Sequence, residues 1–342
     1  MFFFQLSGLA RQIVRIAELS LPSYLSARFV LNVSGEQKKI IWRFSDGRAG
    51  HDAQSMGFVR ALSELVDCEF YDIELPLPFS NYAYGLIKKF PRVLELPDPD
   101  LAIGAGHASH GPLLLARYVR GGKALVFMKP SLPAAFFDIC LIPWHDKTVQ
   151  ASNIIHTEGP LNSLRPSSNL SAKKGLILVG GKSKHFDWND EHVLKQINTV
   201  LAQPTISWTV ADSPRTPAST RALLQDIKND RLHYLSSADK NEAALSDLFQ
   251  KAGVIWVSED SMSMIYESLS TGAAIGILSV PKAQDSRLAG VTSSLSEKKL
   301  VTLFDDWSTG QALVPPTNPL LESQRCALAV ASLLGWSMMN ST

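Results

Sequence analysis

The sequence has too few cysteines for a disulfide framework and no apolar run long enough to span a membrane. Its three cysteines, Cys68, Cys140 and Cys326, are odd in number and widely spaced. This usage indicates reduced thiols in a cytoplasmic setting and excludes a cysteine-rich zinc site. Charged residues interrupt every apolar stretch before it reaches the roughly 18 residues that a membrane span needs.

The chain also lacks an excess of charge of either sign. A formal net charge of +1 gives no general reason to expect a nucleic-acid partner. Apolar residues make up 45% and charged residues 19% of the chain, which is typical of a globular protein with a large core. Because single cores rarely grow beyond about 250 residues, the 342 residues predict two lobes.

Residues 1–34 differ in composition from the rest. They carry Arg11, Arg15 and Arg28 against one acid, Glu18, among many apolar side chains. The basic residues follow the apolar start, which argues against a signal peptide. Two interpretations stay open: a basic amphipathic helix lying on the inner face of a membrane, or an ordinary packed helix or frayed leader.

From residue 38 onward, short β-branched or aromatic runs alternate with helical patterns, which predicts parallel sheets covered on both faces. A polar stretch at 159–174 without apolar periodicity marks a domain boundary. We therefore predict an α/β protein with two Rossmann-like, doubly wound domains facing a cleft. The expected domains are 35–160 and 172–315, followed by a C-terminal helix within 316–342 that can pack across the hinge. The expected strands are 39–45, 68–73, 101–106, 124–128 and 138–143, and then 175–181, 205–211, 231–236, 253–258, 273–279 and 299–304.

Ligands of open parallel sheets bind beyond the carboxyl ends of the strands, so the turns after strands are the places to search for chemistry. The first turn, "SDGRAGHDAQ" at 45–54, combines two glycines with Arg48 and with a group able to take a proton from a hydroxyl, His51 or Asp46. The alternative is a solvated turn in which Asp52 caps the next helix.

Two further turns of the first domain carry histidines. "GAGHASHG" at 104–111 does not have the G-x-G-x-x-G spacing, and the next strand ends without a ribose-binding acid, so a nicotinamide dinucleotide is not expected. His107 or His110 can still line the site. In "PWHD", His145 and Asp146 also follow a strand, and we expect them to line the cleft.

The second domain opens with "LVGGKSKHF" at 178–186, a glycine turn with cationic side chains suited to a diphosphate. The spacing is not that of a P-loop, so nucleoside triphosphate hydrolysis has little support. A companion cation, Arg215, follows another strand. The anion-binding candidates from these turns are Gly181, Lys182, Ser183, Lys184 and Arg215.

The most unusual turn is "SEDSMSMIYESLSTG" at 258–272, which places acids and serines between two apolar strands. If Asp260 caps the helix, Met262, Ile265 and Leu269 face the core, whereas Ser263, Glu267 and Ser270 lie on the opposite face. Serine hydroxyls, including that of Ser261, and helix N-terminal amides suit phosphate oxygens, and a carboxylate two turns along suits a ribose diol. The alternative is a capped surface helix with Glu267 solvated.

Five of these segments, in this order, resemble the family of the plant mitochondrial-fission (elongated-mitochondria) factor and its bacterial homologues, over about residues 38–310. Glu259 and Pro214 depart from the family pattern, which has a small residue and usually an arginine there. The resemblance implies functional roles for Asp46, Arg48, His51, His145, Asp146, Lys184, Arg215, Thr216, Asp260, Ser261, Ser263 and Glu267.

More distantly, the layout is similar to GT-B glycosyltransferases, including the peptidoglycan N-acetylglucosaminyltransferase. That similarity implies a nucleotide-sugar donor of unknown base in the second domain, a lipid-linked or cell-envelope acceptor in the first, and His51 or Asp46 as base. It implies no bound cofactor and no metal, because helix dipoles and cations stabilise the leaving diphosphate. Two alternatives remain: a non-catalytic membrane-surface adaptor that recruits a dynamin-related protein, as the eukaryotic member does, or a sugar-nucleotide epimerase or hydrolase.

Overall fold

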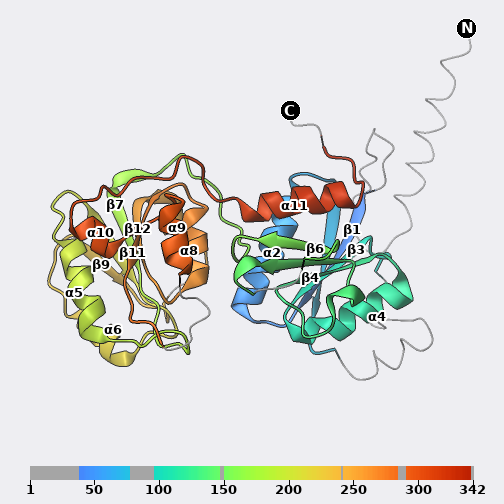
Figure 1. Cartoon of the computed structure of the whole chain (residues 1–342), viewed down its shortest axis with the longest axis horizontal. Coiled ribbons are helices and arrows are strands. Elements are labelled where there is room, and N and C mark those ends of the chain that lie inside the picture. Colours follow the sequence, from blue (N-terminus) through green and yellow to red (C-terminus); the bar gives the residue numbers. More distant parts are fainter. Residues whose placement is uncertain (1–37, 78–95, 147–149, 240–241, 284–289, 340–342) are drawn as a thin grey trace, which may run out of the picture. The chain divides into compact units, whose positions relative to one another are not determined.

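The computed structural model describes residues 38–77, 96–146, 150–239, 242–283 and 290–339 (Figure 1). The predictions for residues 1–34 lie outside this part. No helix among the described residues combines the length and the apolar character needed to cross a membrane.

The first half of the described chain forms a six-stranded sheet in the order β2-β1-β3-β4-β5-β6, in which every neighbouring pair is parallel. All carboxyl ends of its strands therefore lie at one edge. Its elements in chain order are β1 (Lys39–Ser45), α2 (Ala49–Ser63), β2 (Cys68–Glu74), β3 (Leu101–Ala105), η1 (His107–Ser109), α4 (His110–Arg120), β4 (Lys123–Phe127), η2 (Ala134–Phe136), β5 (Ile139–Pro143), η3 (Trp144–Asp146) and β6 (Ile154–Thr157).

Side chains of alternating strand residues pack into two separate cores, one on each face of this sheet. Ile41 and Ile103 pack on one face with Phe58 of α2, whereas Trp42 and Ala102 pack on the other. α4 covers that second face (Figure 1). A strand that is buried on both faces must be apolar throughout, which is why these segments read as continuous apolar runs in the sequence.

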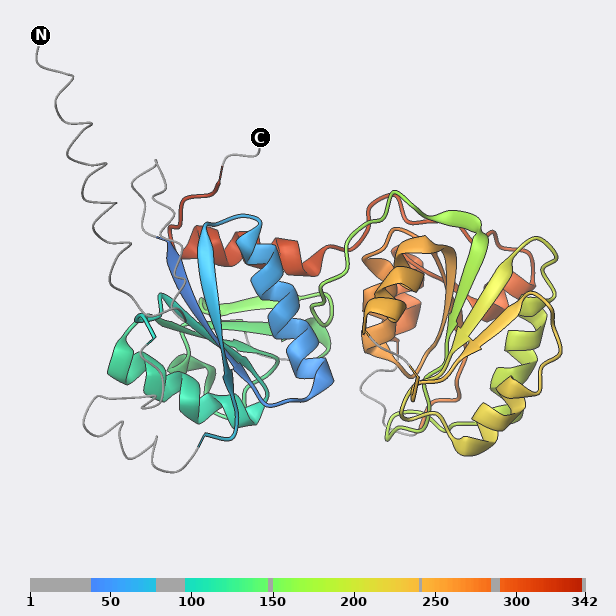
Figure 2. The ribbon, with the colours of Figure 1, turned by 180° about the vertical axis from the view of Figure 1, so that it is seen from behind.

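The second half forms another six-stranded parallel sheet, in the order β12-β11-β10-β7-β8-β9. Helices again cover both faces: α5 and α6 pack on one core, and α7, α8 and α9 on the other (Figure 2). The elements are β7 (Ser171–Leu178), α5 (Asp190–Leu201), β8 (Ser207–Ala211), α6 (Ala218–Gln225), β9 (Leu232–Leu235), α7 (Glu242–Lys251), β10 (Ala252–Ser258), α8 (Met262–Leu269), β11 (Ala274–Leu278), α9 (Val291–Glu297), β12 (Thr302–Leu303) and α10 (Phe304–Ser308).

The last helix, α11 (Glu322–Leu333), returns to the first sheet after the second is complete. Its buried residues Cys326, Ala327, Val330 and Ala331 join the core that α2 forms on that sheet. The segment between the two sheets is fixed by polar contacts to both halves. Within it, Asn162 donates its side-chain amide to the Tyr266 carbonyl of α8, and its own carbonyl accepts the hydroxyl of Ser323 in α11.

The predicted α/β class with two doubly wound parallel sheets is confirmed, and all eleven expected strands are present. The prediction missed β6, whose four residues "IIHT" are shorter than a typical strand. It also began the first strand of the second sheet too late. β7 starts at Ser171, within the stretch that was taken as a polar boundary.

Candidate functional site

The turn after β1 brings Asp46 and His51 together. Nδ1 of His51 lies 2.9 and 3.1 Å from the two carboxylate oxygens of Asp46. Because a carboxylate only accepts, Nδ1 carries the proton in this pair and donates it. Among the described residues Nε2 has no hydrogen-bond partner, so it is the lone-pair nitrogen that can accept a proton from a substrate.

The imidazole is further fixed by the end of β3, the strand next to β1. Gly106 has φ +76°, and a Cβ built on it would lie 2.3 Å from Cε1 of His51. Only a glycine allows this approach. Asp52 does not cap α2, as one interpretation expected; its carboxylate accepts from Ser45 and pairs with the buried Arg43 at 3.2 Å. That ion pair fastens α2 to β1 and thereby the turn that carries His51.

Hydrogen bonding makes Asp46 a weak base. Burial alone would raise the pKa of its carboxyl, but hydrogen bonds from His51 and from the Arg48 amide outweigh that effect and lower the pKa. Asp46 therefore stays ionised and orients His51, whereas His51 is the group that can exchange a proton. Arg48 itself is largely exposed, with Nε 3.8 Å from Asp46.

The other histidines differ in what surrounds them. His107 is exposed in η1, directly after Gly106 and thus beside the Asp46–His51 pair. His110 is buried, receives or donates one hydrogen bond with Ser131, and has its pKa lowered by burial and by His107, so it is a structural residue. His145 and Asp146 lie in η3 after β5, and the side chain of His145 is outside the described part.

At the edge of the second sheet, three turns converge on the carboxylate of Asp260. It accepts from the Gly181 amide at 2.9 Å and from the Ser258 hydroxyl at 2.7 Å. The Gly180 amide in turn donates to Ser258 at 2.7 Å. The two glycine amides expected to bind a diphosphate are therefore already used within the protein, and that expectation is corrected for them. Asp260 also does not cap α8, whose N-cap is Ser261.

Arg215 and Thr216 complete this cluster from the turn after β8. Arg215 donates through Nη2 to Asp260 at 3.0 Å, and through Nη1 to the carbonyls of Gly181 and Lys182. Thr216 is buried and donates to the carbonyls of Val179 and Gly180, so it holds the glycine turn and does not face solvent.

The N-terminal turn of α8 is the part of this cluster that keeps polar groups for a ligand. As in any helix, its first N–H groups have no partner within the helix. The hydroxyls of Ser261 and Ser263 have no hydrogen-bond partner among the described residues. Lys182 and Lys184 are exposed on the neighbouring turn, with Ser183 accepting the His185 amide between them. Ser270, expected on the ligand face, is buried and donates to the Tyr266 carbonyl.

Glu267 lies one turn further along α8 and is half-buried. No hydrogen bond or ion pair to its carboxylate is present in the described part of the chain. Burial raises the pKa of this carboxyl to about 7. A carboxylate held in an apolar setting without a partner is available to accept hydrogen bonds from a ligand hydroxyl.

Glu259, which departs from the family pattern, is a buried residue with its own cation. Its carboxylate accepts from the Thr292 hydroxyl and lies 3.1 Å from Nζ of Lys282. Lys282 forms an isolated bridge with Phe186 of the glycine turn. The extra acid thus adds no unpaired negative charge to the site.

A D-x-D sequence, Asp98-Pro99-Asp100, has the spacing of a metal-binding motif but lies at the other edge of the first sheet. Asp98 pairs with Arg120, and Asp100 accepts the Ile40 amide at 2.8 Å. The structure uses these acids to fix the start of β3. Among the described residues, no three His, Cys, Asp or Glu side chains gather as metal ligands.

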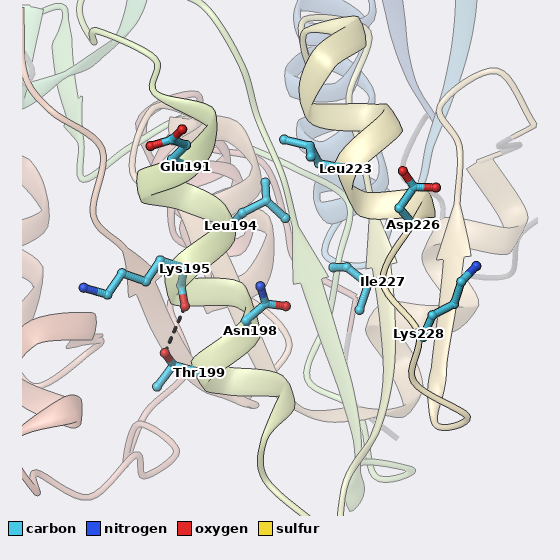
Figure 3. A pocket seen from close by; sticks show the side chains of 9 residues that line it. All are labelled: Glu191, Leu194, Lys195, Asn198, Thr199, Leu223, Asp226, Ile227 and Lys228. Atoms are coloured by element: carbon cyan, nitrogen blue, oxygen red, sulfur yellow. Dashed lines mark hydrogen bonds between the residues drawn. The ribbon is translucent and has the colours of Figure 1, made fainter.

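Two hollows lie in the second half of the chain, and the smaller one reaches the turn after β7. The larger, about 930 Å³, runs between α5 and α6 with Leu194, Leu223 and Ile227 on its floor (Figure 3). The smaller, about 470 Å³, begins at Lys182 and extends to Ser219. Lys182 is the residue that the smaller hollow shares with the predicted site.

A family model described as "Mitochondrial fission ELM1" matches residues 49–334. The chain belongs to this family. A curated relative, the uncharacterized protein RP120 of Rickettsia prowazekii (strain Madrid E), is 22% identical over 323 residues, which is 78% of this chain and 90% of the relative.

Solved structures resemble this family member in fold. A putative UDP-N-acetylglucosamine 2-epimerase from Listeria monocytogenes matches with a TM-score of 0.54 and 10% identity, over 87% of this chain and 97% of that one. An S. aureus MnaA–UDP complex matches with a TM-score of 0.50 and 13% identity, again over 87% and 97%. At these identities the likeness shows the fold, which is GT-B-like as predicted.

Sequence reasoning found most of the polar groups of this family member but misjudged their partners. Ser258 was noticed as a polar turn residue, yet its bridge between Gly180 and Asp260 was not foreseen. Gly106 was considered only as part of a dinucleotide motif. A glycine directly after a predicted buried strand was the available signal for close contact with another turn.

Proposed function

We propose that this protein is a nucleotide-sugar-dependent enzyme that carries out metal-independent, inverting glycosyl transfer to a lipid-linked or other cell-envelope acceptor. One observation carries the proposal: the Asp46–His51 pair, in which Asp46 fixes Nδ1 and leaves Nε2 of His51 as a base at the carboxyl end of a parallel strand. Such placement is where GT-B-like folds present reacting groups.

The proposed reaction is a single displacement. Nε2 of His51 takes the proton of an acceptor hydroxyl, and the hydroxyl oxygen forms a bond to the anomeric carbon. The bond from that carbon to the diphosphate oxygen breaks, and its electron pair leaves with the nucleoside diphosphate. Attack opposite the leaving group inverts the configuration. Positioned proton transfer of this kind typically contributes about 10²- to 10⁴-fold to a rate.

The leaving diphosphate needs positive charge, which the second sheet offers without a metal. The first-turn amides of α8, the hydroxyls of Ser261 and Ser263, and the exposed Lys182 and Lys184 are suited to its oxygens. The carboxylate of Glu267 is suited to the ribose hydroxyls, as acids are in dinucleotide folds. We assign the protein to the cytoplasm, on the inner face of the membrane where an envelope acceptor is available.

Two other functions have a specific observation in their favour. The structures similar in fold are described as a UDP-N-acetylglucosamine 2-epimerase and a UDP complex, which favours epimerisation of a sugar nucleotide. The internal use of the Gly180 and Gly181 amides, together with Pro214 in place of an arginine, favours a catalytically idle membrane-surface adaptor.

Binding and product analysis separate the three functions. Calorimetry with UDP, ADP and CMP sugars should detect one donor, with Glu267→Ala weakening it at least about tenfold. His51→Ala should bind the donor unchanged but release nucleoside diphosphate about 10²- to 10⁴-fold more slowly. An altered sugar nucleotide formed without acceptor would favour the epimerase. Binding of no donor would contradict both enzymes, and unchanged affinity in Glu267→Ala would show that the nucleotide lies elsewhere.

A further inference from the structure

The carboxylate of Asp260 occupies the position that an anion would take beside the glycine turn. A Cβ built on Gly180 would lie 2.3 Å from Oδ2 of Asp260, so the carboxylate is in close contact with the turn's backbone. Its three described partners, the Gly181 amide, the Ser258 hydroxyl and Nη2 of Arg215, are all donors. Burial raises the pKa of this carboxyl, whereas these three donors favour its ionised form, in which it completes the turn from within.

Solvent does not reach this group. The side chain of Asp260 is 0% exposed, whereas that of Arg215 is 42% exposed. A ligand at the surface of the cluster therefore meets the guanidinium and not the carboxylate. The structure therefore places Asp260 behind Arg215 and not at the surface of the cluster.

The contacts of Arg215 leave part of its guanidinium available. Nη1 donates to the carbonyls of Gly181 and Lys182 at 3.2 and 3.3 Å, and Nη2 donates to Asp260. Nε has no acceptor among the described residues. Three acceptors thus fix the plane of the guanidinium before an anion binds. Binding then costs less side-chain entropy than it would with a mobile arginine.

We infer that Asp260 is a positioning residue for phosphate binding: it holds Arg215 and the glycine turn in place, and Arg215 makes the contact with the diphosphate. The inference rests on the proposed nucleotide site and specifies how its charge is arranged. Lys182, Lys184 and the α8 amides supply the remaining donors. Pro214, where the family usually has a second arginine, makes the fixed orientation of Arg215 more important.

The test uses the full-length protein and compares each nucleoside diphosphate, UDP, ADP and CDP, with its nucleoside. Asp260→Asn keeps an oxygen for the Gly181 amide but removes the charge that holds Arg215. We expect it to weaken the diphosphate about tenfold, or about 1.4 kcal/mol, with nucleoside affinity unchanged. Arg215→Gln should do the same, and the double variant should lose no more than either single variant. Lys228→Gln, an exposed cation at the outer hollow, controls for net charge.

The outcomes separate the inference from the proposed function. Suppose that the unmodified protein binds a diphosphate. The positioning role is then overturned, and the nucleotide site stands, if Asp260→Asn weakens the affinity for nucleoside and diphosphate equally. The same holds if the losses of affinity from Asp260→Asn and Arg215→Gln add fully in the double variant. Unchanged affinity in Asp260→Asn overturns it as well. If the unmodified protein binds none of the three diphosphates, both are overturned. Circular dichroism and urea unfolding of each variant show whether it is folded, and Asp260→Glu, which restores the charge, should recover part of the diphosphate affinity.

Discussion

The imidazole of His51 lies directly against the backbone of Gly106, although the two residues belong to turns after different strands. A Cβ on Gly106 would come within 2.3 Å of Cε1 and 2.7 Å of Nδ1 of His51. Nδ1 is also the atom that donates to Asp46. The orientation of the proposed base is therefore set from two sides, by a carboxylate in its own turn and by a missing side chain on the neighbouring strand.

Gly106→Ala should impair the proposed base, His51, by displacing its ring and not by changing its chemical groups. The new methyl group must displace the His51 ring, and the backbone of Gly106, with φ +76° and ψ 165°, adds strain of about 1 to 3 kcal/mol for a residue with a Cβ. We expect a loss of that size in the free energy of unfolding, measured by urea titration, and a drop in turnover of at least about tenfold.

Gly111→Ala provides the matched control. Gly111 lies in α4, and a Cβ there would have no atom within 4 Å. Its free energy of unfolding should stay within about 1 kcal/mol of the unmodified protein, with turnover unchanged. Equal effects of the two substitutions would contradict the role assigned to Gly106.

Asp46→Asn should change both the reaction and the pH dependence of stability. His51 and the Arg48 amide lower the pKa of Asp46 in the folded protein. The ionised carboxylate therefore stabilises the fold at pH values above its unfolded pKa, near 3.8. This contribution to stability is lost as the pH falls through the folded pKa. The free-energy difference between the two proteins should therefore be larger at pH 7 than at pH 3. Turnover should fall about 10²- to 10⁴-fold, since an amide can present the wrong partner to Nδ1.

The exposed Asp226 serves as the control for this substitution. Asp226→Asn should leave turnover unchanged and should change the free energy of unfolding by less than about 0.5 kcal/mol at pH 7. If Asp46→Asn behaves in the same way, the Asp46–His51 bond contributes nothing in solution.

Glu267 should make the stability depend on pH in the opposite direction to Asp46, and Glu267→Gln should remove that dependence. Burial raises the folded pKa of Glu267 to about 7 from 4.5, so the folded state binds one proton more than the unfolded state between these values. Stability then falls as the pH rises from about 4.5 to 7. We expect the variant to match the unmodified protein near pH 4 and to exceed it at pH 8 by about 1 to 3 kcal/mol, in urea titrations at both pH values. A constant difference would show that the carboxylate is solvated.

The fold could be read from the sequence because central strands of both parallel sheets, such as β3, β5 and β11, are buried along their whole length and are therefore continuous apolar runs. The position of Asp46 and His51 in one turn was equally local. Contacts between distant turns were not predictable: Gly181 and Asp260 are 79 residues apart, and their hydrogen bond depends on β7 and β10 being neighbours in the sheet. The apolar pattern of the sequence predicts where strands lie but not their order in a sheet. The contact between Gly106 and His51 depends on that order and could not be predicted.

The ion pair between the buried Glu259 and the exposed Lys282 gives a test of how the glycine turn is supported. Lys282→Met leaves the Glu259 carboxylate with Thr292 as its described partner, and loss of the cation from a mostly buried acid should cost about 1 to 3 kcal/mol in the free energy of unfolding. Glu259→Gln should cost less, because Lys282 is 36% exposed and can be solvated.

A double-mutant cycle decides whether the pair acts as a unit. The combined Glu259→Gln and Lys282→Met variant should be more stable than the sum of the single effects by at least about 0.5 kcal/mol. Lys184→Met, an exposed cation on the same edge of the sheet, should leave the stability within about 0.5 kcal/mol of the unmodified protein. If the two effects on the free energy of unfolding add fully, the Glu259 carboxylate is stabilised by solvent and not by Lys282. The bridge between Lys282 and Phe186 would then hold the glycine turn through the backbone alone.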